Sequence, residues 1–213
     1  MSRSSTVAGD SLAIWAVVPV KALGGAKSRL ASVLDAAQRR ALAAAMLRHT
    51  LDILRACRGL EGILVISVDG LPAVVELGRD VLFVPEEKPT GLNSSLAQAS
   101  AAVLGRGGDG VLVIPGDLPL LTCDSVAALL ALATPRGVVV APDRHEQGTN
   151  ALLVTPPDVI PFRFGPGSLQ RHLAGAVNAG CVPIVHRSRE LAFDVDTSRD
   201  LAQLRDFSPL TRY

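Results

Sequence analysis

The chain has 213 residues, of which 48% are hydrophobic and 19% are charged. That apolar fraction excludes an intrinsically disordered chain, and at roughly 150 residues per domain the length indicates one sizeable domain. The 21 basic and 20 acidic side chains nearly cancel and only 3% of the residues are aromatic, so the positive surface and stacking rings of a nucleic-acid-binding protein are not expected.

Short apolar runs recur along the chain and predict buried strands. They cover residues 12–19, 63–68, 81–84, 111–114, 138–141 and 151–154. Strands without polar alternation are buried on both faces of a sheet. Residues 1–11 are expected to form a flexible lead-in, and residues 12–213 a single domain.

Helical segments separate these strands. Asp35 and Gln38 resemble a capping box that opens a helix ending near Cys57, and Asn93 and Thr122 are candidate N-caps of two more helices. The alternation of strand and helix predicts an α/β fold with a mostly parallel sheet, flanked by helices on both faces as in Rossmann-like three-layer sandwiches. Its ligand sites are expected beyond the carboxyl ends of the strands.

Two segments depart from this alternation. They are residues 148–167, which contain a Pro-Pro pair, and residues 181–196. Both are expected to form a small hairpin-like β addition over the ligand edge of the sheet.

The turn after the first strand concentrates positive charge and glycine. Its sequence, P-V-K-A-L-G-G-A-K-S-R-L, spans residues 19–30. The residues of interest are Lys21, Gly24, Gly25, Lys27 and Arg29. Glycines let backbone N–H groups approach a polyphosphate closely, and the cations neutralise its charge. Phosphate binding is favoured over a solvated basic turn, although the motif is neither a Walker A loop nor a G-x-G-x-x-G fingerprint.

The proline-rich segment 84–93 leads from the third strand into a helix. Its backbone amides, including that of Gly91, and the side chain of Asn93 are candidates for hydrogen bonds to a nucleobase. An N-cap role explains Asn93 equally well.

The fourth strand ends in P-G-D-L-P, which places the carboxylate of Asp117 at the ligand edge. We expect a hard divalent cation such as Mg²⁺ at this edge, because Mg²⁺ prefers a few carboxylates together with substrate phosphate oxygens and water. The alternative, a turn residue that caps the following backbone, is about equally compatible with these letters.

Two ligand-like loops follow, at residues 148–151 and 162–172. Gly165, Gly167 and Ser168 are expected to present backbone donors at a helix N-terminus, which is an anion site by geometry. Candidates among the neighbouring side chains for adding positive charge are Arg163, Arg171 or His172. A simple turn with an N-cap is the alternative.

A late acidic pair, Asp194 and Asp196, points to one side if the segment is extended. One of the two is expected to complete a metal site with Asp117, and we favour Asp194 for the metal and Asp196 for support. Equally, Asp196 or Thr197 is a candidate cap for the last helix, predicted over residues 198–206.

The remaining chemistry-bearing residues indicate no further site. The three cysteines are widely spaced and odd in number, which suggests neither a disulfide framework nor a zinc site and fits a reducing cytoplasm. The first apolar run is too short to span a bilayer, so no membrane association is expected. His49 and His186 lack ligand spacing, and we interpret both as structural.

Five motifs, in this order, carry a family resemblance: P-V-K-A-L-G-G-A-K-S-R-L, P-G-D-L-P, T-G-L-N, G-T-N-A-L-L and F-R-F-G-P-G-S. Over about residues 14–205 the chain resembles the 2-phospho-L-lactate guanylyltransferase family of coenzyme F-420 biosynthesis, whose bacterial members are also described as phosphoenolpyruvate guanylyltransferases. The resemblance implies a nucleotide-diphospho-sugar-transferase-like fold. It also implies a reaction in which GTP and a phosphorylated three-carbon acid give a guanosine diphospho-conjugate and pyrophosphate.

The same resemblance implies roles for individual residues. The acceptor-binding positions match Thr149, Gly165 and Ser168, with Asn150 as the alternative to Thr149, and the metal carboxylate matches Asp117. The implied cofactor is Mg²⁺, the implied partners are GTP and either phosphoenolpyruvate or 2-phospho-L-lactate, and a homodimer is compatible with the sequence.

The implied chemistry explains why no general base stands out. A phosphate monoester has a second pKa of about 6, so the acceptor is already a dianionic nucleophile at neutral pH. We expect an in-line attack on the α-phosphorus of GTP, with Mg²⁺ bridging nucleotide oxygens and Lys21, Lys27 and Arg29 offsetting the charge of the departing pyrophosphate. The alternatives are a molybdenum-cofactor or sugar-phosphate nucleotidyltransferase, and a non-catalytic GTP-binding regulator.

Overall fold

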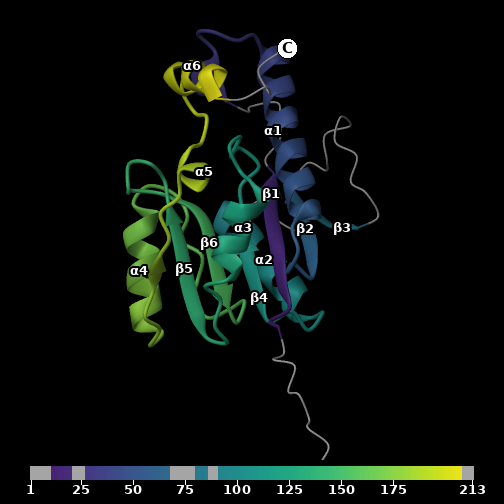
Figure 1. The fold of residues 1–213 in the computed structure, drawn as a ribbon, viewed down its shortest axis with the longest axis vertical. Helices are drawn as coiled ribbons and strands as arrows, with labels where there is room; N and C mark the ends of the chain where they lie inside the picture. The colour runs from purple at the N-terminus through teal and green to yellow at the C-terminus, as the bar shows by residue number, and fades with distance from the viewer. Residues whose placement is uncertain (1–10, 21–26, 68–79, 86–90, 208–213) are drawn as a thin grey trace, which may run out of the picture.

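The computed structural model in Figure 1 describes residues 11–20, 27–67, 80–85 and 91–207. In this part of the chain one seven-stranded sheet has the order β3-β2-β1-β4-β6-β5-β7. The strands are β1 (Ile14–Val20), β2 (Gly62–Ser67), β3 (Val81–Pro85), β4 (Gly110–Val113), β5 (Gly137–Pro142), β6 (Thr149–Thr155) and β7 (Ile184–Val185). Each predicted apolar run coincides with one of the first six strands, with small differences at the ends.

The sheet is mostly parallel, as the alternation predicted. β1 pairs in parallel with β2 and β4, β2 with β3, and β5 with β7. β6 is the exception, because it runs antiparallel to both β4 and β5. Only residues 143–148 connect β5 to β6, and a parallel crossover needs a dozen residues or more, so the two strands form a hairpin.

The prediction of a β addition lying over the ligand edge is wrong. β6 and β7 belong to the main sheet, and every residue of β6 is buried. The antiparallel direction of β6 has a functional consequence. Its first residues, Thr149 and Asn150, lie at the edge where the parallel strands β1 and β4 end.

Helices cover both faces of this sheet (Figure 1). The helices are the 3-10 helix η2 (Ser28–Leu30) and α1 (Ala36–Ala56), α2 (Leu92–Leu104), α3 (Cys123–Leu130), α4 (Ser168–Asn178), α5 (Arg189–Ala192) and α6 (Ser198–Phe207). Ala16 and Val18 of β1 belong to the core cluster that contains α1 and α3. Val17, between them, belongs to the cluster that contains α2 and α4. The predicted three-layer α/β architecture is therefore confirmed.

Two of the predicted helix starts are confirmed. The N–H of Gln38 donates to Asp35 Oδ1 over 2.8 Å, and the N–H of Asp35 donates to Gln38 Oε1 over 2.9 Å. This capping box opens α1, which ends with Cys57 as its C-cap. Thr122 caps α3 in the same reciprocal way.

Asn93 is not an N-cap, so that prediction is wrong. Gly91 occupies the cap position of α2 with φ 109°, and Asn93 is the second residue of the helix. Glycine adopts this backbone conformation without the steric cost that a side chain imposes. The side chain of Asn93 is engaged elsewhere, with the backbone of Phe164.

A small third cluster of buried side chains connects three segments that lie far apart in the sequence. It joins Leu30 of η2, Met46 of α1, and Leu201 and Leu204 of α6 with the segment that precedes α6. In that preceding segment the buried side chains are those of Phe193 and Val195. Asp194 and Asp196 alternate with them along the chain. The cluster thereby fixes both the end of the basic turn and the acidic pair at one end of the sheet. Among the described helices none is long and apolar enough to cross a bilayer.

Candidate active site

A cavity of about 660 Å³ lies at the carboxyl ends of β1 and β4. Sites for small ligands typically have volumes of about 300–1,000 Å³. Apolar side chains of α1 and α2 line one part, and polar residues gather in another. The polar and loop residues are Lys27, Ser28, Arg29, Gly116, Asp117, Thr149, Asn150, Gly165, Asp194 and Asp196. A smaller cavity of about 320 Å³ lies beside β5 and β7, and of the described residues that line it Arg136 alone is charged.

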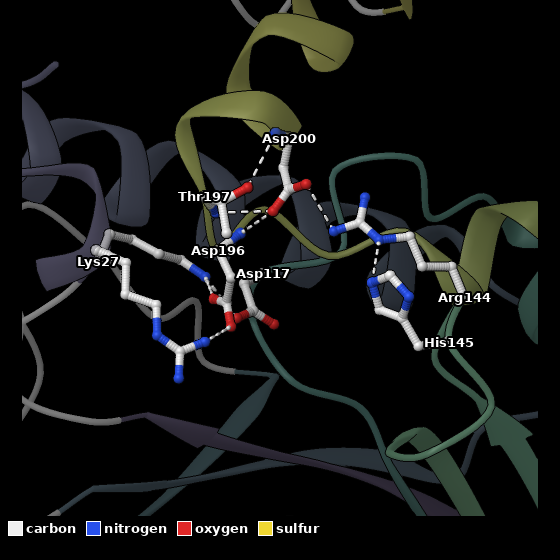
Figure 2. Close-up of polar contacts among 8 residues, drawn as sticks. Lys27, Asp117, Arg144, His145, Asp196, Thr197 and Asp200 are labelled. Atoms are coloured by element: carbon white, nitrogen blue, oxygen red, sulfur yellow. Dashed lines mark hydrogen bonds and ion pairs between the residues drawn. The ribbon is translucent and has the colours of Figure 1, made fainter. Parts of the chain in front are cut away.

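Lys27 joins two acidic loops of the cavity (Figure 2). Its Nζ lies 2.7 Å from Asp117 Oδ2 and 3.0 Å from Asp196 Oδ1, and its side chain is 9% exposed. Burial alone lowers the pKa of the ammonium group, but the carboxylates of Asp117 and Asp196 outweigh burial, so the pKa is raised. Lys27 is therefore a fixed positive charge inside the cavity.

Arg29 extends this positive charge toward solvent. Its Nη1 lies 3.6 Å from Asp196 Oδ2, while its side chain is 75% exposed. Two of the predicted cations thus lie at the site. Lys21, Gly24 and Gly25 lie outside the described residues.

Asp194 adds negative charge that these two cations do not directly pair. Its side chain is half-buried, and the pKa of its carboxyl group is raised, first by burial and then by the carboxylates of Asp196 and Asp117. Among the described residues no ion pair involves Asp194, whereas Asp196 contacts both Lys27 and Arg29. The two acidic residues therefore differ in their ion pairs, and the division of roles between them stays a prediction.

Asp117, Asp194 and Asp196 do not form a metal cage of three carboxylates, and the expectation that one of the acidic pair completes a metal site with Asp117 stays a prediction. In the described part of the chain no group of three or more His, Cys, Asp or Glu side chains has the arrangement to hold a metal ion. The physical reason is that the ammonium group of Lys27 occupies the space between Asp117 and Asp196. The donors still fit Mg²⁺, which is usually bound by one or two carboxylates, with phosphate oxygens and water completing the shell.

Asp200 holds the acidic segment in place. Its Oδ2 accepts hydrogen bonds from the backbone N–H groups of Asp196 (3.0 Å) and Thr197 (2.7 Å), as Figure 2 shows. In return, Thr197 Oγ1 accepts from the N–H of Asp200, so Thr197 caps α6, as one of the predicted alternatives had it. Sequence reasoning missed Asp200, although its position three residues after Thr197 matches a capping-box pattern.

The acceptor residues implied by the resemblance lie partly in the cavity. Thr149 and Gly165 line it, whereas Ser168 is 1% exposed at the start of α4 and is not among the lining residues. Of the predicted nucleotide-binding residues, Lys27 lines the cavity, and Gly91 and Asn93 do not.

Asn93 instead ties α2 to the loop that carries Gly165. Its Oδ1 accepts from the N–H of Phe164 over 2.7 Å, and its Nδ2 donates to the carbonyl oxygen of Phe164 over 3.2 Å. The side-chain amide of Asn93 therefore pairs with both the N–H and the C=O of Phe164, as the backbone of a neighbouring strand would. Phe164 and Gly165 both line the cavity, so Asn93 contributes to its shape from behind.

Solved structures identify the fold. A crystal structure described as a nucleotide-diphospho-sugar transferase from Desulfovibrio desulfuricans G20 matches with a TM-score of 0.74 and 21% identity, covering 93% of this chain and 90% of that one. The 4-diphosphocytidyl-2C-methyl-D-erythritol synthase of Anaerococcus prevotii matches with a TM-score of 0.65 and 10% identity, covering 93% and 96%. The fold is thus that of the nucleotidyltransferases.

Sequence relatives narrow this class. The family described as "Guanylyl transferase CofC like" matches residues 14–205, and the chain belongs to it. Phosphoenolpyruvate guanylyltransferase of Sphaerobacter thermophilus is 41% identical over 196 residues, which are 92% of this chain and 94% of that protein. The protein of the same description from Rubrobacter xylanophilus is 43% identical over 198 residues, with 91% and 94% covered. The family resemblance and the nucleotidyltransferase class predicted from the motifs are confirmed.

Proposed function

We propose that this protein transfers GMP from GTP to the phosphate group of phosphoenolpyruvate and releases pyrophosphate. The observation that carries the proposal is the buried ammonium group of Lys27, held between Asp117 and Asp196 inside a cavity large enough for a nucleotide. The names of relatives that are 41% and 43% identical favour phosphoenolpyruvate over 2-phospho-L-lactate as the acceptor.

The acceptor itself serves as the nucleophile. Its phosphate group is largely dianionic at neutral pH, so an oxygen attacks the α-phosphorus in line without a protein base. The described residues that line the cavity include no histidine, which is consistent with this chemistry. The bond from the α-phosphorus to the bridging oxygen breaks, and pyrophosphate leaves with that oxygen.

The protein's main task is to bring two anions together. Lys27 supplies a positive charge that is already desolvated and oriented, so little reorganisation is needed as charge develops on the leaving group. Arg29, which is more exposed, offsets charge nearer the entrance. Lys21 is the third cation that we propose to offset the charge of the departing pyrophosphate.

Asp117 and Asp194 are the residues that would hold Mg²⁺, which when bound neutralises charge on the phosphate oxygens of the nucleotide. Asp196 acts in support, because it pairs with Lys27 and Arg29 and so keeps both cations directed into the cavity. Thr149 and Gly165 face the same cavity and bind the acceptor, with Ser168 behind them at the start of α4.

The direct test is a turnover assay with purified protein, GTP, Mg²⁺ and either phosphoenolpyruvate or 2-phospho-L-lactate. We expect pyrophosphate release with phosphoenolpyruvate and a product with the mass of its guanosine diphospho-conjugate. No turnover with either acceptor would overturn the proposal. Turnover with a sugar phosphate would indicate another nucleotidyltransferase, and tight GTP binding that survives Asp117→Asn without turnover would indicate a regulator.

The proposed setting is the cytoplasm. Cys57, Cys123 and Cys181 are free thiols, and free thiols persist in reducing compartments. A homodimer stays a prediction, which light scattering of the purified protein would test.

A further inference from the structure

His172 is a buried residue that the proposed reaction does not yet use. It lies on α4 with 0% of its surface exposed. Both ring nitrogens are engaged: Nδ1 lies 2.9 Å from Thr149 Oγ1, and Nε2 accepts a hydrogen bond from the backbone N–H of Arg163 over 3.0 Å. The ring also packs edge-to-face on Phe164, with centroids 4.9 Å apart. His172 therefore contacts two segments of the acceptor side of the cavity at once.

These contacts define which nitrogen carries the proton. The backbone N–H of Arg163 can only donate, so Nε2 must be the unprotonated acceptor. Burial, with a smaller contribution from Arg171, lowers the pKa of His172 to about 4, so the ring is neutral at pH 7. A neutral imidazole has one N–H, which is therefore on Nδ1 and donates to Thr149 Oγ1.

The direction of this hydrogen bond determines what the Thr149 hydroxyl group can offer a ligand. Because its oxygen accepts from His172, its own proton is directed elsewhere. Thr149 lines the cavity that also contains Gly165 and Lys27. The hydroxyl group is thus prepared to donate to an acidic ligand, whose carboxylate or phosphate oxygens only accept.

We infer that His172 is a positioning residue for the acceptor, which holds the Thr149 hydroxyl group as a hydrogen-bond donor and fixes the loop at Arg163. The inference rests on the proposed function, which supplies the phosphorylated acid that the hydroxyl group contacts. It assigns His172 no contact with the reacting atoms.

Three variants separate the two contacts of His172. His172→Gln places an amide near Nε2, so the contact with Arg163 is retained in part and the donor to Thr149 is lost. His172→Asn places an N–H near Nδ1, so the donor to Thr149 is retained and the contact with Arg163 is lost. Thr149→Val removes the hydroxyl group and nearly preserves the shape.

The expected result is a selective loss of acceptor affinity. His172→Gln and Thr149→Val should each raise the KM for phosphoenolpyruvate about tenfold or more, because each weakens a hydrogen bond to a charged ligand, which is stronger than one between neutral groups. The kcat and the KM for GTP should change less than about twofold. His172→Asn should restore most of the affinity. Combining His172→Gln with Thr149→Val should cost no more than Thr149→Val alone, since both remove one interaction.

Binding and NMR measurements make the outcome decisive. Nitrogen-15 NMR of the wild-type protein at pH 7 should show His172 protonated at Nδ1 only, and the opposite tautomer would overturn the inference whatever the activity. Additive losses in the double variant, or a correctly folded His172→Gln protein with an unchanged KM, would also overturn it. Wild-type protein that binds phosphoenolpyruvate in calorimetry without turning it over contradicts the proposed function alone, and His172→Gln must then weaken that binding. Protein that does neither contradicts both.

Discussion

The guanidinium group of Arg144 lies 2.7 Å from the carboxylate of Asp200, whose side chain is 5% exposed. Arg144 also donates its backbone N–H to the carbonyl oxygen of Ala192, and its guanidinium group lies 5.2 Å from the ring centroid of Phe193. Asp200 in turn binds the backbone N–H of Asp196. The loop between β5 and β6 therefore holds the acidic segment from both ends, which positions its carboxylates against Lys27.

Arg144→Met should destabilise the protein because it leaves the buried carboxylate of Asp200 without its cation. Removal of one partner of a buried ion pair typically costs about 3–5 kcal/mol, and the partial exposure of Arg144 places the expected loss near about 3 kcal/mol. Denaturant unfolding measures this free energy. We also expect a reduced kcat, since the segment that carries Asp196 loses its support.

Arg187→Met is the matched control. Arg187 pairs with Glu146 in the neighbouring region, but the two side chains are 62% and 52% exposed. Exposed ion pairs contribute little to stability, so this variant should unfold near the wild-type midpoint. Equal losses for both variants would show that the Arg144 pair is no more than a surface interaction.

Lys27→Met should lower kcat/KM by about 100-fold or more, because a preorganised, buried charge in an active site contributes on this scale. Lys27→Arg is not expected to restore activity, since a planar guanidinium group does not fit the position that an ammonium group occupies between two carboxylates. Steady-state kinetics measures both.

Arg29→Met provides the comparison for Lys27. Its side chain is 75% exposed, so solvent already screens its charge, and the expected loss is less than about fivefold. Near-equal losses at Lys27 and Arg29 would mean that burial does not determine their contribution.

Local signals explain the parts of the structure that the sequence predicted correctly. Strands such as β1 are continuous apolar runs because both faces are buried, and the Asp35–Gln38 box depends on residues three apart. Asp117, a few residues after the end of β4, likewise predicted a carboxylate at the ligand edge. Each of these features depends on residues that are neighbours in the chain.

Long-range contacts explain the parts that the sequence did not predict. Arg144 meets Asp200, and His172 meets Thr149, across 56 and 23 positions of the chain. No spacing rule connects such pairs, because the sheet order brings them together. The error at Asn93 has the same origin: its side chain prefers the backbone of Phe164, 71 positions away, to the start of its own helix.

Asp194→Asn should raise the Mg²⁺ concentration needed for half-maximal activity by at least about tenfold, since even outer-shell residues of metal sites typically contribute 10–100-fold to metal affinity. The reason is that Asp194 is the carboxylate without an ion pair among the described residues, so a divalent cation does not compete with Lys27 for it. A magnesium titration at saturating substrates measures this. Asp124→Asn, in an exposed side chain of α3, should leave the titration unchanged, and a shift of equal size there would contradict the assignment.

Asn93→Asp should weaken acceptor binding, although residue 93 does not line the cavity. The new carboxylate still accepts from the N–H of Phe164, but it no longer donates to the carbonyl oxygen of that residue and repels it instead. A lost hydrogen bond of this kind costs about 1–3 kcal/mol, so the KM for phosphoenolpyruvate should rise roughly tenfold. Asn178→Asp, at the exposed end of α4, is the matched control. An unchanged KM in a folded Asn93→Asp protein would show that the loop keeps its shape without this tie.

The stability of the protein should fall between pH 6.5 and pH 4 because of His172. Its pKa is lowered from 6.5 to about 4 by burial and by Arg171, so in this range the unfolded chain binds a proton that the folded protein does not. The contribution of His172 to the free energy of unfolding therefore rises with pH across this window. It is fully present above pH 6.5 and is lost as the pH falls toward 4. At about 1.4 kcal/mol per pH unit, the loss approaches on the order of 3 kcal/mol at pH 4.

Denaturant unfolding at several pH values isolates this contribution when wild-type protein is compared with His172→Gln. Carboxylates such as Asp200, whose pKa is lowered by hydrogen bonds from the Thr197 and Asp196 segment despite its burial, titrate in both proteins and cancel in the difference. The variant should therefore be less stable at pH 7 but lose less stability on acidification. Parallel curves for wild-type and His172→Gln protein would show that folding does not lower the pKa of His172, and would contradict this prediction.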